Sequence, residues 1–224
     1  MADLPPLDRL VTTRHSLHRA AEHVLAAALK RATGQIALVA APGGVATPPL
    51  PDGTVLSLLG PDVVVARADD VRRERLTTVR AAAAFAGTEP GFPWTKHPPA
   101  TPEDVDAALD VDDASAAVLD DWFGLGDRTL AAWSAELPAG EPSAAQVFPE
   151  HFDLAITAGE VNYGFSPGDE AQPLPYVYVG PWAPPTQDDF WNAAFGAYRT
   201  IEQVGGLDAA LGFLRAARAR LTAG

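Results

Sequence analysis

Apolar residues recur at helical spacing near both ends of the chain. From about Thr13 to Arg31 they repeat every three or four residues and predict one amphipathic helix. Thr33-Gly34 follows, with glycine where a left-handed helix cap forms most readily. A second stripe predicts a C-terminal helix, and its apolar positions are Leu207, Ala210, Leu211, Leu214, Ala217 and Leu221.

Two further helical regions are expected in the middle of the chain. Residues 69–86 carry an imperfect apolar face that a glycine closes. Residues 112–137 begin with an aspartate suited to capping a helix and have their own apolar side. Gly124 and Gly126 interrupt this region, and the low helix propensity of glycine predicts a break into two helices. A proline-rich loop is expected over residues 88–103.

Strand-like runs fall into two sets, separated by glycine and proline turn signals. The first set has connections too short for parallel crossovers, which predicts an antiparallel meander. Its members are residues 35–40, 45–50, 54–59 and 62–67. The second set follows Pro142 and consists of residues 152–157, 160–166 and 175–180. A turn-rich aromatic segment then runs from Pro181 to Tyr198.

The order helix, strands, helices, strands, helix predicts an α+β fold. Neither strand set has enough partners to bury both of its faces alone. We therefore expect the two sets to join, as one antiparallel sheet or as two packed sheets, under N-terminal, central and C-terminal helices. No stretch has the composition of a flexible linker, so residues 1–224 are expected to form a single domain.

Charge narrows the classes of partner. The formal net charge is −13, and residues 81–198 carry 19 Asp and Glu against two Lys and Arg. A field of this sign repels phosphate groups, so neither nucleic acid nor a membrane is expected as a partner. The acidic middle is typical of a solvated surface, with a cation-binding surface as the alternative.

Cysteine usage and the N-terminus bear on location. The chain has no cysteine, which excludes disulfides and thiolate metal sites and favours a reducing compartment. No secretory signal and no spanning segment of roughly 20 apolar residues is present. These features predict a cytoplasmic protein. The sequence also lacks a Gly-x-Ser-x-Gly elbow and a phosphate-binding loop, which weighs against a serine hydrolase and a nucleotide enzyme.

The densest run of unusual polar residues lies on two consecutive strands of the second set. If residues 158–159 form a two-residue hairpin loop, Asp153 lies opposite Gly164 and His151 opposite Ser166. Strand alternation then puts five polar side chains on one face. These are His151, Asp153, Glu160, Asn162 and Ser166, with Asp169 close enough in sequence to contribute.

This face allows a ligand site or a catalytic site. His151 and Asp153 could flank a divalent ion, or Asp153 could orient His151 as a general base. No second histidine lies at a ligand spacing, so the sequence requires no cofactor and leaves a divalent metal open. The alternative is an outward-facing hairpin whose side chains bond loop backbone. His15 and His18 share a helix, where solvent exposure is expected.

Aromatic residues gather late in the chain. They predict either a stacking wall for a sugar or another flat ligand, with Trp182 and Trp191 as candidates, or a core beneath irregular loops.

Short motifs in the last third of the chain form a recognisable series. They are Phe152-Asp153-Leu154-Ala155, Gly164-Phe165-Ser166-Pro167-Gly168-Asp169, Pro175-Tyr176-Val177-Tyr178 and Asp208-Ala209-Ala210-Leu211-Gly212-Phe213-Leu214. The series resembles an uncharacterised bacterial, actinobacterial domain-of-unknown-function family. The resemblance implies a shared fold and points to residues 152–169, and it carries no activity. Glu150 and His151 depart from the family pattern, which has aromatic and small residues there.

Three functions follow from these observations, in descending order. The first is a small-molecule-binding protein with a polar and aromatic pocket near residues 150–198. The second is a metal-assisted or acid/base hydrolase that uses His151, Asp153 and Glu160. The third is an interaction module that presents an acidic surface to a partner, with homo-oligomerisation left open.

Overall fold

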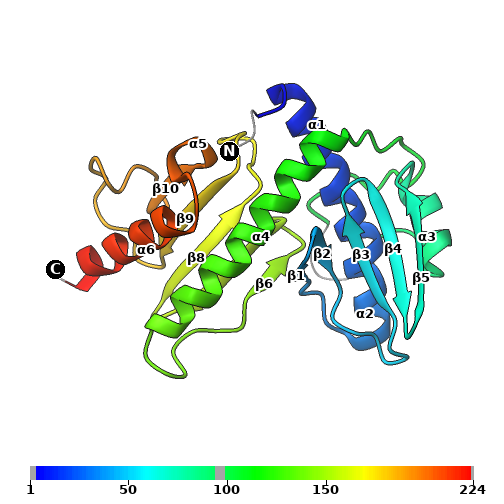
Figure 1. Cartoon of the computed structure of the whole chain (residues 1–224), viewed down its shortest axis with the longest axis horizontal. Coiled ribbons are helices and arrows are strands. Elements are labelled where there is room, and N and C mark those ends of the chain that lie inside the picture. The colour runs from blue at the N-terminus through cyan, green and yellow to red at the C-terminus, as the bar shows by residue number, and fades with distance from the viewer. Residues whose placement is uncertain (1–3, 94–98, 223–224) are drawn as a thin grey trace.

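The strands form two antiparallel five-stranded sheets (Figure 1). The computed structural model describes residues 4–93 and 99–222. The first sheet consists, in spatial order, of β1 (Val39–Ala41), β2 (Gly44–Ala46), β3 (Val55–Leu59), β4 (Asp62–Arg67) and β5 (Asp70–Arg75). The second consists of β10 (Ala197–Thr200), β9 (Tyr176–Pro181), β8 (Val161–Ser166), β7 (Asp153–Ala158) and β6 (Gln146–Phe148).

The two sheets meet edge to edge. Leu38, next to β1, and Val147 in β6 exchange two backbone hydrogen bonds of 3.0 and 2.8 Å. The strand sets therefore join through a single bridging pair. The predicted α+β fold, with antiparallel strands from two sets, is confirmed.

A continuous helical rod begins the fold. It consists of α1 (Leu7–Ala20), the π-helical segment η1 (Ala21–Ala26) and α2 (Ala27–Thr33). The rod begins earlier than the predicted Thr13, and Gly34 ends it in the left-handed conformation, with φ of +80°. All six residues of η1 are buried. A π-helical turn is wider than an α-helical one and is often associated with a functional site.

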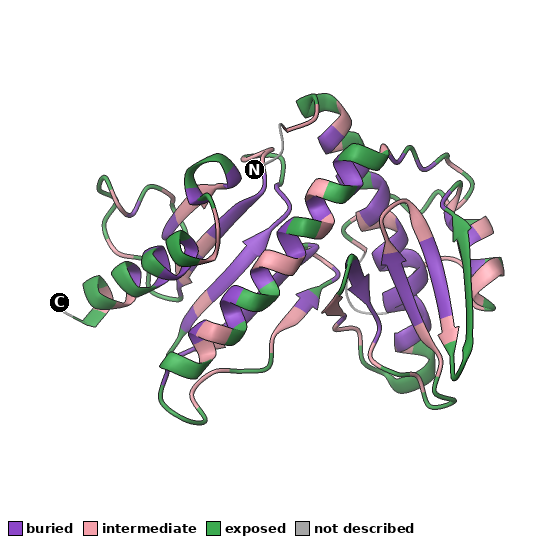
Figure 2. Cartoon of the chain, in the orientation of Figure 1, coloured by how far each residue is buried: buried purple, intermediate pink, exposed green. Residues whose placement is uncertain are grey.

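The prediction of one helix over residues 69–86 is wrong for its first half. β5 pairs with β4 at the outer edge of the first sheet, and only then does α3 (Val79–Ala86) begin. Ala68, with φ of +50°, makes the turn between the two strands. All six residues of β5 are exposed, as its green colour in Figure 2 shows. An edge strand with charged side chains on both faces has no apolar alternation to reveal it.

The central helix α4 (Asp113–Glu136) is unbroken, so the predicted break at Gly124 and Gly126 is wrong. Asp112 caps it as expected, accepting a hydrogen bond of 2.9 Å from the Ser115 amide. A Cβ on Gly126 would lie 2.8 Å from Cγ of Phe165 in β8. Glycine at this position lets the helix approach the sheet closely.

Two helices complete the chain, α5 (Ile201–Val204) and α6 (Leu207–Thr222). α6 packs against α4 and β9, and Figure 1 shows α4 and α6 lying over the second sheet. The short edge strands β6 and β10 escaped the sequence prediction. Residues 94–98, which include Trp94, Lys96 and His97 of the predicted proline-rich loop, lie outside the described residues.

Buried hydrophobic side chains form one cluster that includes residues from both sheets. Strands of both sheets are purple along much of their length in Figure 2. In the cluster, Trp133 of α4 meets Tyr163 of β8 edge-on at 5.4 Å. None of the helices within residues 4–93 and 99–222 has the length and apolar content needed to cross a bilayer.

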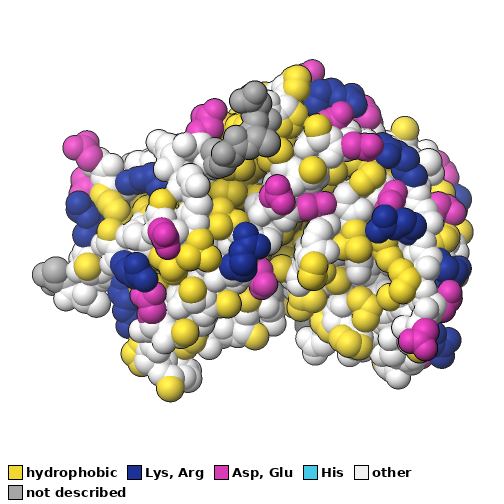
Figure 3. All heavy atoms as spheres, viewed as in Figure 1, with side chains coloured by type: hydrophobic (Ala, Val, Ile, Leu, Met, Phe, Trp, Pro, Cys, Tyr) yellow, Lys and Arg dark blue, Asp and Glu magenta, His cyan; other side chains and the backbone are white. Residues whose placement is uncertain are grey.

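Charged side chains of opposite sign lie together on the surface. Figure 3 shows Lys and Arg groups beside Asp and Glu groups over much of one face. Several of these pairs join an acid of residues 81–198 to an arginine outside that range, such as Asp113 with Arg75 at 2.7 Å and Glu136 with Arg215 at 2.6 Å. The basic flanking segments therefore balance part of the charge of the acidic middle.

Candidate functional site

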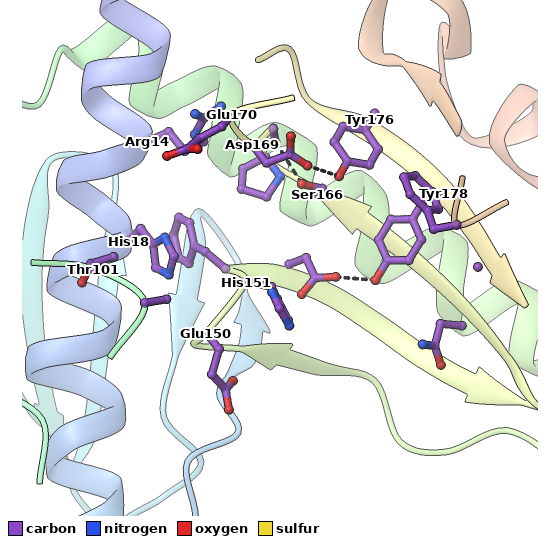
Figure 4. Close-up of a pocket in the computed structure, with 18 of the residues that line it drawn as sticks. Arg14, His18, Thr101, Glu150, His151, Ser166, Asp169, Glu170, Tyr176 and Tyr178 are labelled. Carbon is purple, nitrogen blue, oxygen red and sulfur yellow. Dashed lines mark hydrogen bonds between the residues drawn. The ribbon is translucent and has the colours of Figure 1, made fainter. Parts of the chain in front are cut away.

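A cavity of about 990 Å³ lies between α1 and the second sheet. Arg14, His15, His18 and Arg19 of α1 line one side, and side chains of β7, β8 and β9 line the other. Residues 100–102 and the segment after β9 complete the wall. Figure 4 shows Arg14 and His18 on the helix, facing Tyr176 and Tyr178 across the hollow.

Six of the eight residues predicted to bind a ligand line this cavity. They are His151, Asp153, Asn162, Ser166, Asp169 and Trp182. The other two do not. Glu160 lies in an exposed hairpin turn, and Trp191 is 5% exposed and belongs to the hydrophobic core.

The predicted hairpin loop at residues 158–159 is wrong by one position. Ala158 pairs with Val161, so Gly159 and Glu160 form the loop. Both have positive φ, +56° and +61°, as a type I′ turn requires, and glycine adopts this conformation without strain. The shift moves the register by two residues, so Asn162 and Ser166 stay on the face of Asp153. Glu160 leaves that face for the turn.

Asp153 and Tyr178 form a buried pair at one end of the cavity. The Tyr178 hydroxyl donates a hydrogen bond to Oδ2 of Asp153 (dashed line in Figure 4). Oδ1 of Asp153 is buried and has no hydrogen-bond partner in the described part of the chain. Burial raises the pKa of the Asp153 carboxyl, and the bond from Tyr178 opposes that rise. Burial and the adjacent carboxylate raise the pKa of Tyr178 well above its usual value.

Asp169 forms a second tyrosine–aspartate pair, but its hydrogen bonds are complete. Oδ2 accepts a bond of 2.5 Å from the Tyr176 hydroxyl. Oδ1 accepts bonds from the backbone amides of Ala171 and Gln172 at 2.7 and 2.8 Å. Ser166 is engaged similarly, since its Oγ accepts a bond of 3.1 Å from the Gly168 amide. Asp169 and Ser166 therefore shape the loop after β8.

The histidines are arranged differently from the prediction. His151 is exposed, and no hydrogen bond joins it to Asp153 within residues 4–93 and 99–222. His18 is more buried than His151: its ring stacks on Phe152 at 5.3 Å, and its Nε2 lies 2.7 Å from the Pro149 carbonyl oxygen. Burial lowers the pKa of His18, and Nε2 donates to that carbonyl in the tautomer that carries its proton there.

The π-helical segment holds another part of the cavity wall. Glu22 of η1 is fully buried, and its carboxylate accepts three hydrogen bonds from residues 100–101. They come from the Ala100 amide at 2.8 Å, the Thr101 amide at 2.9 Å and the Thr101 hydroxyl at 2.6 Å. A buried carboxylate with this many donors is a fixed anchor for the segment.

No protein-family model, curated protein or solved structure matches this chain. The chemistry of the cavity is therefore inferred from its own residues.

The geometry adds little to the metal prediction. Among the described residues, no group of three or more His, Asp or Glu side chains is placed to hold a metal ion. A cation between His151 and Asp153 would lack a third side-chain ligand of these kinds, and metal sites are commonly built from three or four protein ligands.

Charge is distributed unevenly inside the cavity. At the helix side, Arg14 is 5% exposed, donates to the Pro173 carbonyl at 3.0 Å and is near Asp169 and Glu170. At the opposite side, Tyr178 (Figure 4) donates its hydrogen bond to Asp153. The exposed aromatic side chains Trp182 and Phe195 also line the cavity. The helix side thus holds a cation, Arg14, with acids nearby. The opposite side holds Asp153, whose carboxylate has one oxygen without a hydrogen-bond partner, together with aromatic side chains.

The α1 contributions were missed by sequence reasoning. Arg14, His15, His18 and Arg19 are separated by more than 130 residues from the β7–β8 hairpin. The spacing of His15 and His18 placed them on one helix but could not indicate which surface that helix would face.

Proposed function

We propose that this chain is a small-molecule-binding protein whose ligand site is the cavity between α1 and strands β7, β8 and β9. The observation that carries the proposal is the convergence of the predicted polar residues on one hollow of about 990 Å³. Ligand sites in proteins are concave, span roughly 300–1,000 Å³ and combine aromatic walls with a few polar groups.

The unpaired oxygen of Asp153 supports the same proposal. Buried polar atoms nearly always have a hydrogen-bond partner, and Oδ1 of Asp153 is one of five such side-chain atoms without one in the described part of the chain. Leaving such an atom unsatisfied costs about 1–3 kcal/mol, which a ligand group would recover on binding.

The test is a thermal-shift screen of the full chain against a metabolite panel. A ligand at 100 times its dissociation constant adds about 2.7 kcal/mol of stability. Trp182→Ala should reduce the shift, because Trp182 lines the cavity and is 64% exposed, so its truncation leaves the core intact. Val71→Ala is the matched control, since Val71 is 65% exposed on β5, away from the cavity. A Trp182→Ala protein that binds as the wild type does would contradict the placement of the site.

A second candidate is acid/base catalysis, which the Asp153–Tyr178 pair favours. Two hydrogen-bonded titratable groups with raised pKa values in a cavity are typical of catalytic sites. Glu160 cannot share this role from the exposed turn. Tyr178→Phe should then abolish turnover of a bound compound while the compound still binds. Equal losses of binding and turnover would contradict catalysis by this pair and leave binding as the supported function.

A further inference from the structure

We propose that the Asp153 region of the cavity recognises an ammonium group, so that the ligand is an amine-bearing organic cation. This inference rests on the proposed binding function and specifies its ligand class.

What the region lacks is a hydrogen-bond donor. Tyr178 supplies one donor to Oδ2 of Asp153, and Oδ1 receives none in the described part of the chain. The Asp153 side chain is almost entirely buried, at 7% exposed. Oε2 of Glu150, which also lines the cavity, is likewise buried and without a partner. Two carboxylate oxygens are therefore free to accept hydrogen bonds from N–H or O–H groups of a ligand.

The arginines of the cavity do not meet this need. Arg14 donates to the Pro173 carbonyl, and Arg19 donates to the Asp104 carbonyl, although Nε of Arg19 is buried without a partner in the described part of the chain. Both belong to α1, and Figure 4 shows Arg14 beside Glu170 and Asp169, across the hollow from Tyr178. Two side chains act electrostatically on Asp153: exposed His151, which lowers its pKa and has the larger influence of the two, and Glu150, which raises it. An ammonium group would place its positive charge beside the carboxylates of Asp153 and Glu150.

Aromatic side chains favour an ammonium over a neutral hydroxyl. Phe195 meets the Tyr178 ring edge-on at 6.1 Å, and both line the cavity with Trp182. The Trp182 indole N–H points to Oδ1 of Asn162, 3.5 Å away. Aromatic faces attract cations through their quadrupole, and substituted ammonium ions are commonly bound against such faces. A sugar hydroxyl could donate to either unpaired oxygen, but it carries no positive charge to pair with the two carboxylates.

The experiment compares matched probes of different charge on the full chain. The amines are benzylamine, phenethylamine and N-methylbenzylamine; benzyl alcohol and 2-phenylethanol are neutral counterparts, and 3-phenylpropionate is the anion. Each is added at about 10 mM, above the dissociation constants of weak fragments. Melting temperature is measured first, and titration calorimetry follows for compounds that raise it. We expect the amines to stabilise the protein and the neutral and anionic probes not to.

Variants locate the effect. Asp153→Asn should weaken amine binding at least about tenfold, since it removes the charge and keeps the shape. Glu202→Gln, on the exposed side of α5, removes the same charge elsewhere and should leave amine affinity unchanged. If Asp153→Asn does not fold, Glu150→Gln and Trp182→Ala provide the same comparison, each with a predicted loss of several-fold.

The outcomes separate the two proposals. Stabilisation by neutral or anionic probes but not by amines overturns the ligand class and leaves the binding function standing. Amine binding that survives in Asp153→Asn, or in both Glu150→Gln and Trp182→Ala, also overturns it. If no probe and no member of the metabolite panel stabilises the protein, both proposals fail.

Discussion

The ring of Tyr178 lies over Gly164, its partner across the pairing of β8 and β9. A Cβ on Gly164 would be 2.5 Å from both Cε1 and the hydroxyl oxygen of that ring. Because Gly164 has no side chain, Tyr178 of β9 crosses β8 and reaches Asp153 of β7. One glycine thus determines which group bonds the buried carboxylate.

Gly164→Ala is therefore expected to destabilise the fold. The added methyl must displace the Tyr178 ring, and overpacking of this kind costs about 1–3 kcal/mol. Urea unfolding measures the change. Gly212→Ala is the control, because nothing in the described chain lies within 4 Å of a Cβ there, and alanine should add up to about 1 kcal/mol of stability in α6. Equal stability of the two variants would show that the Tyr178 ring is free to move.

Tyr178→Phe tests the hydrogen bond itself. Its removal leaves both oxygens of Asp153 without partners and should cost about 1–3 kcal/mol near neutral pH. The bond lowers the pKa of Asp153, so that pKa should rise further in the variant. A carboxyl whose pKa is raised in the folded state makes the protein less stable as the pH increases. The stability lost in Tyr178→Phe should therefore be smaller in acid, where Asp153 is protonated.

The control for this prediction is Tyr198→Phe. The Tyr198 hydroxyl accepts a hydrogen bond of 3.2 Å from Nε2 of Gln172, and no acid of the described residues is bonded to it. Its loss should be smaller and independent of pH. Urea unfolding at about pH 4 and pH 8 measures the stability that Tyr178→Phe loses relative to the wild type. An equal loss at both pH values would contradict the pairing with Asp153.

Elements with a one-sided apolar pattern were predictable, and elements without one were not. β4 was placed at its observed residues, 62–67, because it is buried and bounded by clear turns. The sequence predicts helix for β5, because its side chains are all exposed and show no alternation of apolar and polar residues. Glycine was misread in α4, since sequence alone cannot distinguish a helix break from a close approach to another element.

Gly126→Ala and Gly124→Ala form a matched pair on α4. Alanine favours helix over glycine by up to about 1 kcal/mol at either site. At Gly126 the new methyl would meet Phe165 at 2.8 and 3.0 Å, so net destabilisation is expected. At Gly124 the nearest atom is the flexible Arg128 guanidinium at 3.4 Å, so stabilisation is expected. Thermal unfolding should give shifts of opposite sign, and two positive shifts would mean that α4 is free to move away from β8.

The candidate site was half visible in the sequence. Strand alternation grouped Asp153, Asn162 and Ser166 on one face, because that property is local and survived the register error. The opposite wall comes from α1 and from residues 100–102. Its position depends on tertiary packing, and Tyr178 was read only as one member of an aromatic cluster. No local pattern marks a tyrosine that reaches across a neighbouring strand.

Glu22→Ala should release the wall formed by residues 100–102. Three donors of Ala100 and Thr101 would lose their acceptor, which is expected to cost about 3 kcal/mol or more. Hydrogen exchange at the two amides should accelerate more than exchange in β8. Glu89→Ala, at an exposed position, is the control for charge. Unchanged exchange at Ala100 and Thr101 would show that Glu22 does not hold this segment.

Asp120→Asn should make stability less dependent on pH. Asp120 of α4 accepts a hydrogen bond of 2.8 Å from the Gly60 amide. The pKa of its carboxyl is raised to about 7, mainly by burial. The folded state therefore holds the proton more tightly than the unfolded state. The contribution of protonated Asp120 to the free energy of unfolding is complete below pH 4 and is lost as the pH rises to about 7. The loss is at most about 4 kcal/mol.

The asparagine variant keeps the acceptor for Gly60 and has no charge to bury. Urea unfolding should find it close to the wild type at pH 4 and more stable at pH 8. Asp121→Asn is the control, because Asp121 is exposed and acts on Asp120 only by raising its pKa. This variant should shift the pH dependence of the unfolding free energy slightly along the pH axis and leave its steepness unchanged. If Asp120→Asn runs parallel to the wild type from pH 4 to pH 8, Asp120 does not titrate with a raised pKa.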